Sequence, residues 1–271
     1  MIKISELYIY PVKSLAGIKL NSARLSPLGL QYDRRWMIVN NDGRFISQRE
    51  LAKMATIKTK IVAGQLTLSH MDSEIKVPSA GAHFEQKKIT LWNDTFEATH
   101  LSNQVDIWLS DILQQDCQLV YMQEDVQRQI DMDFSPNGQN VSFADAYPIL
   151  LISQASLDDL NSKLQKPVNI NRFRVNIVVA GTNAFAEDDW QDLSINGIEF
   201  KAVKKCSRCI VPSINQQTGI KDQAKMLSVL SNYRKEDKKI KFGQNLIYKN
   251  TSSINEQWIS SGDEIILETF A

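Results

Sequence analysis

The chain has 271 residues, of which 43% are hydrophobic and 23% are charged, and its 31 lysines and arginines balance its 31 aspartates and glutamates. These proportions are typical of a globular protein, and the length allows one large domain or two modest domains with their own cores. A formal net charge of zero gives no overall field to recruit nucleic acid or an anionic membrane, so we expect neither as a partner.

The N-terminus and the cysteines indicate the compartment. Residues 1–6 form no apolar signal core, and no run in the sequence approaches the roughly 18 apolar residues of a membrane span. The three cysteines are an odd number without the spacing of a disulfide framework, which suits a reducing environment. We therefore expect a cytoplasmic protein.

Short alternating apolar runs separated by turn residues dominate the chain. They predict a mainly β protein with some helix, in the α+β class, built from antiparallel sheets or barrels. Hairpins are predicted at Asn41–Gly43, Asn93–Asp94 and Asn196–Gly197. The third signal is the strongest, because Asn-Gly supplies the positive φ angles that a type I′ turn needs.

Three segments carry apolar residues at helical spacing, within 105–113, 157–164 and 226–233. Ser102 is the expected cap of the first helix, and Pro167 is expected to end the second. Because a new strand follows the first helix at about residue 117, we predict two domains, 1–112 and 113–271. The first strands can still pack with the second domain.

Two of the three cysteines, Cys206 and Cys209, form a C-x-x-C motif beside Lys204, Lys205 and Arg208. Nearby positive charge lowers the pKa of a cysteine and favours the thiolate, which attacks electrophiles or binds a soft metal. Buried, unreactive thiols are the ordinary alternative.

A structural zinc site and a redox dithiol are both disfavoured at this motif. Structural zinc needs four ligands, and the sequence has no second C-x-x-C. A thioredoxin-like dithiol opens a helix, whereas an alternating strand precedes this motif and Pro212 follows it.

Four further polar clusters lie where strands meet turns, at 10–14, 33–36, 153–156 and 172–176. Taken singly, each is explained by solvated charges or a helix cap. Taken together, they predict a cradle for an anion. Arginine and lysine suit phosphate oxygens, a serine at a helix start adds amide donors, and an asparagine can bind the edge of a heterocycle.

The motifs also follow one another in the order of a known family. The sequences Y-P-V-K-S, D-R-x-W-M-I, S-x-A-S-L, R-F-R-x-N-I-V-V, A-E-D-x-W, C-S-R-C-I and F-G-Q-N resemble MOSC-domain proteins with a MOSC N-terminal region. Within that family the chain is most similar to YcbX-like proteins and the mitochondrial amidoxime-reducing component. The resemblance covers nearly the whole chain. It implies a mixed α/β MOSC N-terminal region packed on a MOSC β-barrel, with a cofactor between them.

The resemblance implies a molybdenum cofactor, a pterin dithiolene with a terminal phosphate whose metal also binds one protein cysteine. Cys209 matches that metal ligand and Cys206 becomes its neighbour, while Asp188 is a second catalytic candidate that would orient a cationic partner or a substrate proton. Other matched residues would hold the pterin and its phosphate or flank the metal: Lys13, Ser14, Arg34, Ser153, Arg174, Asn176, Ser207 and Arg208. Arg35 and Arg172 match less closely. Pyridoxal phosphate binding is a further cofactor expectation from the same resemblance.

The implied activity is the reduction of N-hydroxylated compounds, such as hydroxylamines, amidoximes or N-hydroxylated bases, with release of water. No cysteine follows Cys209, so we expect the electrons to come from a separate ferredoxin or flavin reductase type of protein. The alternatives are a carrier or binding module for the cofactor or for sulfur, and an interaction protein without a cofactor.

Two positions depart from the family pattern. Val175 stands where the family usually has proline, and residues 215–219 read N-Q-Q-T-G where D-P-D-T-G is usual. The second departure removes negative charge. If those acids attract a substrate or an electron donor in relatives, the side chains of residues 215–219 do not provide that attraction here.

Overall fold

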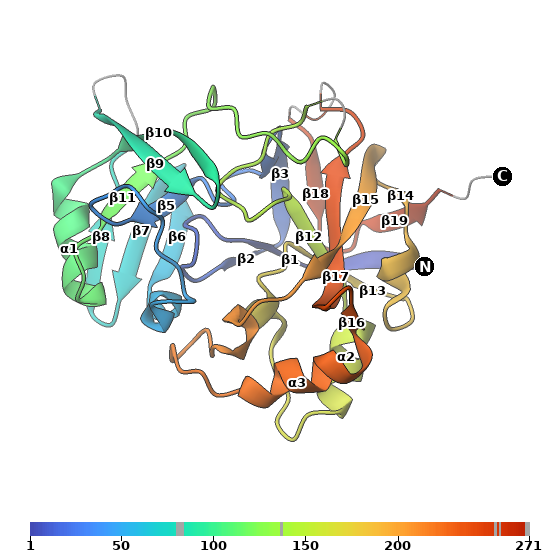
Figure 1. Ribbon diagram of the computed structural model, residues 1–271. Helices are drawn as coiled ribbons and strands as arrows, with labels where there is room; N and C mark the ends of the chain where they lie inside the picture. The colour runs from blue at the N-terminus through green and yellow to red at the C-terminus, as the bar shows by residue number, and fades with distance from the viewer. Residues whose placement is uncertain (80–83, 136–137, 252–253, 255, 269–271) are drawn as a thin grey trace.

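The computed structural model describes residues 1–79, 84–135, 138–251, 254 and 256–268 (Figure 1). The protein is mainly β with a few helices, which confirms the predicted fold class. Two β-rich parts lie side by side, and helices α2 and α3 lie below the second part in the view of Figure 1. None of the helices within the described ranges is long and apolar enough to cross a membrane.

The second part is a β-barrel. Within the described residues, seven strands follow the order β12-β13-β1-β19-β14-β15-β17, and β17 pairs back with β12 to close the ring. Their inward side chains form one core that includes Leu7, Leu151, Ile177 and Phe200. The strands are β1 (Ile2–Ile9), β12 (Ile149–Ser153), β13 (Ile177–Ala180), β14 (Asp192–Ile195), β15 (Ile198–Ser207), β17 (Lys239–Tyr248) and β19 (Glu264–Leu267).

Among its described residues, the first part contains two sheets and one α-helix. A four-stranded sheet has the order β5 (Trp36–Val39), β11 (Gln118–Tyr121), β10 (Asp94–His100) and β9 (Gln86–Leu91). A second sheet consists of β6 (Lys58–Val62), β7 (Gln65–His70) and β8 (Ser73–Lys76). Helix α1 (Asn103–Leu113) buries its apolar face in the same core as these sheets, through Val105 and Leu109.

Shorter elements surround the barrel. Helices α2 (Gln154–Ser162) and α3 (Ala224–Tyr233) share a core with the barrel's outer face, through Leu160, Leu230 and Phe242. The remaining elements are β2 (Ile18–Leu20), β3 (Ser22–Ser26), β4 (Gly29–Leu30), β16 (Lys235–Glu236), β18 (Trp258–Ser260) and the 3₁₀ turns η1 (Ala52–Thr56), η2 (Ile170–Phe173), η3 (Ala186–Asp189) and η4 (Val211–Ser213).

The predicted hairpins form, with one shift. Ile195 pairs with Ile198, and the intervening Asn196 and Gly197 have φ angles of 50° and 75°, which confirms the Asn-Gly turn. The second hairpin turns one residue earlier than predicted, because Leu91 pairs with Asp94 and the loop is Trp92-Asn93. The Asp94 carboxylate accepts a hydrogen bond from Arg128 at 2.8 Å, which holds that residue in the strand.

Of the two serines that precede helices α1 and α2, only Ser153 forms a capping hydrogen bond. Ser102 precedes α1 in an extended conformation, but its side chain makes no capping hydrogen bond. Ser153 caps α2, since its Oγ accepts a hydrogen bond from the backbone N–H of Ser156 at 3.0 Å. That helix ends at Ser162, before Pro167 can disrupt it.

The chain passes between the two parts more than once. Strand β1 lies in the barrel between β13 and β19, although it begins the chain. Strand β11 lies in the sheet of the first part, although it follows residue 112. Residues 122–148, here called the connecting segment, then lead from β11 to β12. The division of the chain at residue 112 stays a proposal.

Candidate functional site

A cavity of about 610 Å³ is lined by the first part, the connecting segment and the barrel. Its wall is strongly cationic. Ten lysines and arginines line it against three aspartates: Lys13, Arg34, Arg49, Arg128, Arg172, Arg174, Lys204, Lys205, Arg208 and Lys239, with Asp94, Asp131 and Asp145. A concave wall with this charge excess attracts an anion, in a protein whose net charge is zero.

Tyr10 is the platform for two of the predicted anion-binding residues. The guanidinium carbon of Arg34 lies 4.5 Å from the centre of the Tyr10 ring, and that of Arg174 lies 4.3 Å from it. Arg34 also forms an ion pair with the buried Asp33. Arg174 donates to the Leu15 carbonyl at 2.7 Å. Both cations are therefore held in fixed positions before any ligand arrives.

The backbone at these residues is unusual. Ser14, Arg34 and Arg174 have φ angles of 69°, 50° and 55°, in the left-handed region that side chains other than glycine rarely adopt. Such conformations persist where the surrounding structure enforces them, and they cluster at functional sites. All three residues line the cavity.

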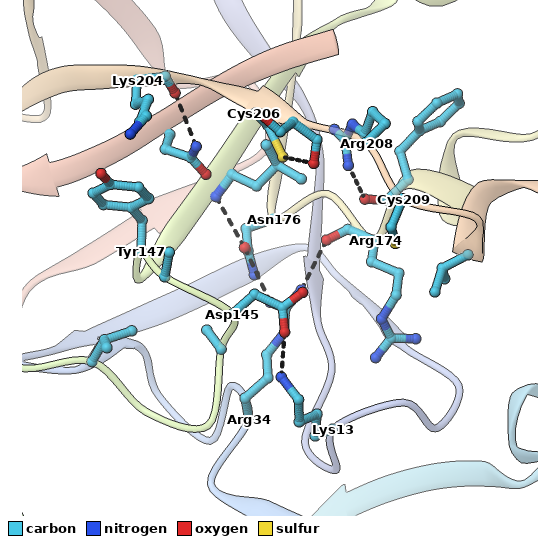
Figure 2. Close-up of a pocket in the computed structure, with 18 of the residues that line it drawn as sticks. Lys13, Arg34, Asp145, Tyr147, Arg174, Asn176, Lys204, Cys206, Arg208 and Cys209 are labelled. Atoms are coloured by element: carbon cyan, nitrogen blue, oxygen red, sulfur yellow. Dashed lines mark hydrogen bonds and ion pairs between the residues drawn. The ribbon is translucent and has the colours of Figure 1, made fainter. Parts of the chain in front are cut away.

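Lys13 is buried, with 6% of its surface exposed, and its charge already has partners. Its Nζ lies 2.5 Å from Asp145 Oδ1 and donates to the Phe143 carbonyl at 2.7 Å (Figure 2). Burial lowers the pKa of Lys13 to about 8, against the opposing effect of Asp145. The carboxylate of Asp145 also pairs with Arg49, at 3.2 Å.

Asn176 orients Arg34. Its Oδ1 accepts hydrogen bonds from Arg34 Nη1 and from the Leu150 backbone N–H, each at 3.1 Å, and its Nδ2 donates to the Tyr8 carbonyl at 3.2 Å. The amide is therefore engaged by the protein. Asn176 thereby holds Arg34 at the cavity wall.

The C-x-x-C motif forms one wall of the same cavity. Cys206 is the second-last residue of β15, and Cys209 lies in the turn between β15 and η4. Arg208 donates from Nε to the Phe242 carbonyl at 2.8 Å and from Nη1 to the Phe173 carbonyl at 3.0 Å. Ser207 Oγ accepts a hydrogen bond from Lys241 at 3.1 Å.

The two thiols have different surroundings. Burial raises the pKa of Cys206, and the nearby Arg208 does not offset it. The expectation that the surrounding cations favour a thiolate is therefore wrong for Cys206, because desolvation outweighs charge attraction. Cys209 is half-buried and free, and it lines the same cavity as Arg49. In Figure 2, Cys209 and Arg174 lie on the same side of the drawn site.

Two predicted site residues lie outside the cavity lining. Ser153 is fully buried, where its backbone N–H donates to Glu187 at 3.0 Å and its side chain caps α2. Asp188 is bound by Arg234 and lies 3.6 Å from Lys205. Both side chains are therefore engaged by the protein and do not line the cavity.

Sequence reasoning missed Arg49, Arg128 and Asp145. Arg128 donates to the backbone carbonyls of Ser142, Ala144 and Asp145 at 2.6–3.1 Å, which ties two stretches of the connecting segment to each other. The motifs gave no signal for these residues, because each lies in an irregular segment and finds its partners through the tertiary fold. The only indication of a site role in the sequence was that these charged residues lie in predicted loops.

Two family models match the chain. Residues 1–116 match the MOSC N-terminal beta barrel domain, and residues 138–266 match the MOSC domain. Mitochondrial amidoxime-reducing component 1 of Homo sapiens is 31% identical, over 93% of this chain and 80% of that protein. The chain belongs to the MOSC-domain family with a MOSC N-terminal domain.

Further MOSC relatives match along most of this chain. Mitochondrial amidoxime-reducing component 1 of Mus musculus is 31% identical, over 85% of this chain and 71% of that protein. A molybdenum cofactor sulfurase of Solanum lycopersicum is 30% identical over 97% of this chain, which covers 35% of the sulfurase. Lys13, Arg34 and Arg49 lie within the MOSC N-terminal match, whereas Arg174 and Cys209 lie within the MOSC match. Both MOSC modules therefore contribute to the cavity.

Proposed function

We propose that this MOSC protein binds a molybdenum cofactor in the cationic cavity and reduces N-hydroxylated compounds, such as hydroxylamines, amidoximes or N-hydroxylated bases. One observation carries the proposal. The Nη2 atoms of Arg174 and Arg208 are buried and have no hydrogen-bond partner within the described residues. Both arginines line the cavity together with the free thiol of Cys209.

Unpaired buried charged donors are costly, so they point to a missing acceptor. A phosphate or a pterin carbonyl supplies such acceptors, and a thiolate is a ligand suited to a soft metal. The residues present therefore fit the cofactor. Cys209 would bind the metal, while Arg34, Arg174, Arg208 and Lys13 would hold the pterin and phosphate. When bound, the cofactor supplies the two-electron oxygen-transfer chemistry.

In this proposal, several residues hold the cofactor-binding side chains in position before the cofactor binds. Tyr10 and Asn176 hold the guanidinium groups in place, so binding requires little reorganisation. Arg128 links two stretches of the connecting segment and bonds that segment to Asp94 of the first part. The names of the amidoxime-reducing relatives support the substrate class, and electrons would come from a separate protein of the ferredoxin or flavin reductase type.

A second candidate is a carrier or binding module that holds the cofactor, or handles sulfur at Cys209, without reductive turnover. The match to a molybdenum cofactor sulfurase along 97% of this chain favours it. Such a protein would use the same cradle and the same thiol. Only turnover separates the two candidates.

Elemental analysis for molybdenum tests the cofactor assignment directly. The protein is purified from a host that makes the cofactor, together with the Cys209→Ala and Cys206→Ala variants. We expect molybdenum in the wild type and in Cys206→Ala, and its loss from Cys209→Ala with the fold intact by circular dichroism. Metal retained in Cys209→Ala but lost from Cys206→Ala would reverse the ligand assignment. A wild type without molybdenum would contradict the proposal.

A further inference from the structure

Gln48 and Gln216 form a reciprocal pair of side-chain hydrogen bonds between the two MOSC modules, here called the amide clamp. Gln48 Nε2 donates to Gln216 Oε1 at 3.1 Å, and Gln216 Nε2 donates back to Gln48 Oε1 at 3.0 Å. Gln48 lies within the MOSC N-terminal match and Gln216 within the MOSC match. Because Gln48 is fully buried, water cannot replace the partners of its amide.

The amide clamp reaches the cationic cavity through Ser14. Gln48 Nε2 also donates to the Ser14 backbone carbonyl at 2.7 Å. Ser14 lines the cavity beside Lys13, and its φ of 69° is a conformation that serine keeps only where its surroundings enforce it. The next carbonyl, of Leu15, accepts a hydrogen bond from Arg174 at 2.7 Å. Two donors, one from each module, therefore hold the same turn.

The loop that carries Gln216 is itself ordered and packs on the first part. Asn215 Oδ1 accepts a hydrogen bond from the backbone N–H of Gln217 at 2.9 Å, which tightens the loop. A Cβ atom added at Gly219 would lie 3.1 Å from the carbonyl oxygen of Ala52, so the loop approaches η1 closely. Gln216 therefore offers its amide to Gln48 from a fixed position.

We propose that Gln48 is a positioning residue for the cationic cavity. Through the amide clamp it joins the two modules, and it holds the left-handed turn that presents Lys13 and Ser14 to a bound anion. The clamp also gives a role to the departure from the D-P-D-T-G pattern, because Gln216 stands where proline is usual and proline has no side-chain hydrogen-bonding group. The inference rests on the proposed function only in taking that anion to be the molybdenum cofactor.

The test measures how tightly unloaded protein binds inorganic pyrophosphate, an anion probe for the cavity, by isothermal titration calorimetry. Gln48→Met removes the donor to Ser14 and keeps the length of the side chain. A hydrogen bond typically changes an equilibrium constant roughly twofold to tenfold, and we expect Gln48→Met to weaken pyrophosphate binding by about that factor. Gln139→Met is the matched control and should keep the wild-type affinity, since Gln139 is also buried but its amide bonds the Tyr248 carbonyl of β17.

Rescue by glycine separates a positioning role from a purely structural one. Glycine adopts positive φ angles without the steric cost that serine meets there. In a Ser14→Gly background the clamp is needed less, so Gln48→Met should weaken pyrophosphate binding less than it does beside Ser14. Urea unfolding is followed in parallel. A purely structural role predicts the same loss of affinity from Gln48→Met in both backgrounds.

A double-mutant cycle tests the clamp as one unit. Gln216→Ala removes the reciprocal partner but leaves the bond from Gln48 to Ser14, so we expect a smaller loss of affinity than in Gln48→Met. The double variant should bind pyrophosphate about as well as Gln48→Met alone. Molybdenum content at limiting cofactor should follow the same order among the variants.

Several results would overturn the inference. They are a wild-type affinity in Gln48→Met, an equal loss in the Gln139→Met control, and an undiminished effect of Gln48→Met in the Ser14→Gly background. Fully additive effects of Gln48→Met and Gln216→Ala would contradict the clamp. A wild type that binds pyrophosphate but no molybdenum would contradict the proposed function and leave this inference standing, whereas a wild type that binds neither would overturn both.

Discussion

Arg34 donates a hydrogen bond from Nη2 to the backbone carbonyl of Arg174 at 2.9 Å, and both guanidinium groups lie against the ring of Tyr10. Two like charges are thus held side by side. Burial, followed by repulsion from Arg34, lowers the pKa of Arg174 to about 10. An anion bound between them would relieve this repulsion, so the pair favours anion binding.

Replacing Arg174 should weaken cofactor retention. A charge-assisted hydrogen bond contributes about 1.5–3 kcal/mol, which is roughly a tenfold or larger change in affinity. We therefore expect Arg174→Ala to lose at least that much occupancy at limiting cofactor, measured as molybdenum per chain. Lys239→Ala, at an exposed cation of the same lining, is the control and should lose little. Full occupancy in Arg174→Ala would refute the cradle.

The hydroxyl and the ring of Tyr10 can be tested separately by substitution. Its hydroxyl is buried without a partner among the described residues, whereas its ring supports both arginines. Tyr10→Phe removes an unsatisfied group and keeps the ring, so we expect unchanged or slightly increased stability and normal cofactor binding. Tyr10→Leu removes the ring and should cost roughly 2 kcal/mol, from two cation–π contacts and lost packing. Urea unfolding and molybdenum content measure the two effects. Equal behaviour of both variants would contradict the platform role.

Lys13 should give stability a characteristic pH dependence. Burial lowers its pKa from 10.5 to about 8. Between these pH values the unfolded chain keeps a proton that the folded protein has released. Because the unfolded state binds more protons there, this group makes the free energy of unfolding rise with pH from about 8 to about 10.5.

The Lys13→Met variant isolates that contribution. We expect the difference in unfolding free energy, wild type minus Lys13→Met, to increase across the same pH window in urea titrations. Lys58→Met, on the exposed edge strand β6, is the matched control and should run parallel to the wild type. A flat difference for Lys13→Met would mean that the folded protein does not disfavour the Lys13 charge.

Local sequence signals predicted local structure well. The Asn196-Gly197 turn and the α2 cap at Ser153 follow from the chemistry of a few adjacent residues. The cavity residues Lys13, Arg34 and Arg174 were also found, since each lies in a motif with unusual charge near a turn. The mainly β class followed from alternation along the strands.

Contacts between residues far apart in the sequence could not be predicted from short sequence motifs. Ser153 is satisfied by its own helix and by Glu187, so its polarity marks a cap and not a cavity. Asp188 Oδ2 accepts a hydrogen bond from Arg234, 46 residues away. Conversely, Arg49 and Asp145 line the cavity through an ion pair that joins residues 96 positions apart. Charge alone does not say which partner a side chain will find.

The source of electrons is the last prediction. These 271 residues contain three cysteines, fewer than the four that a cluster needs, and we propose one of them, Cys209, as the metal ligand. They also contain no G-x-G-x-x-G fingerprint for a nicotinamide dinucleotide. Under the proposed function we expect a separate protein to deliver electrons near the cavity, where exposed lysines such as Lys204 and Lys239 favour an acidic partner.

Purified protein containing molybdenum should then be inactive with NADH and a hydroxylamine. Reduced viologen, a chemical one-electron donor, should start turnover with about two electrons consumed per substrate, since reduction of an N–O bond to an amine and water is a two-electron step. The Cys209→Ala variant is the control and should stay inactive with either donor. Stoichiometric oxidation of NADH by the isolated wild type would contradict the need for a partner. If the molybdenum-loaded wild type shows no turnover with reduced viologen, the result would favour the cofactor-carrier function. A carrier holds the cofactor without passing electrons to a substrate.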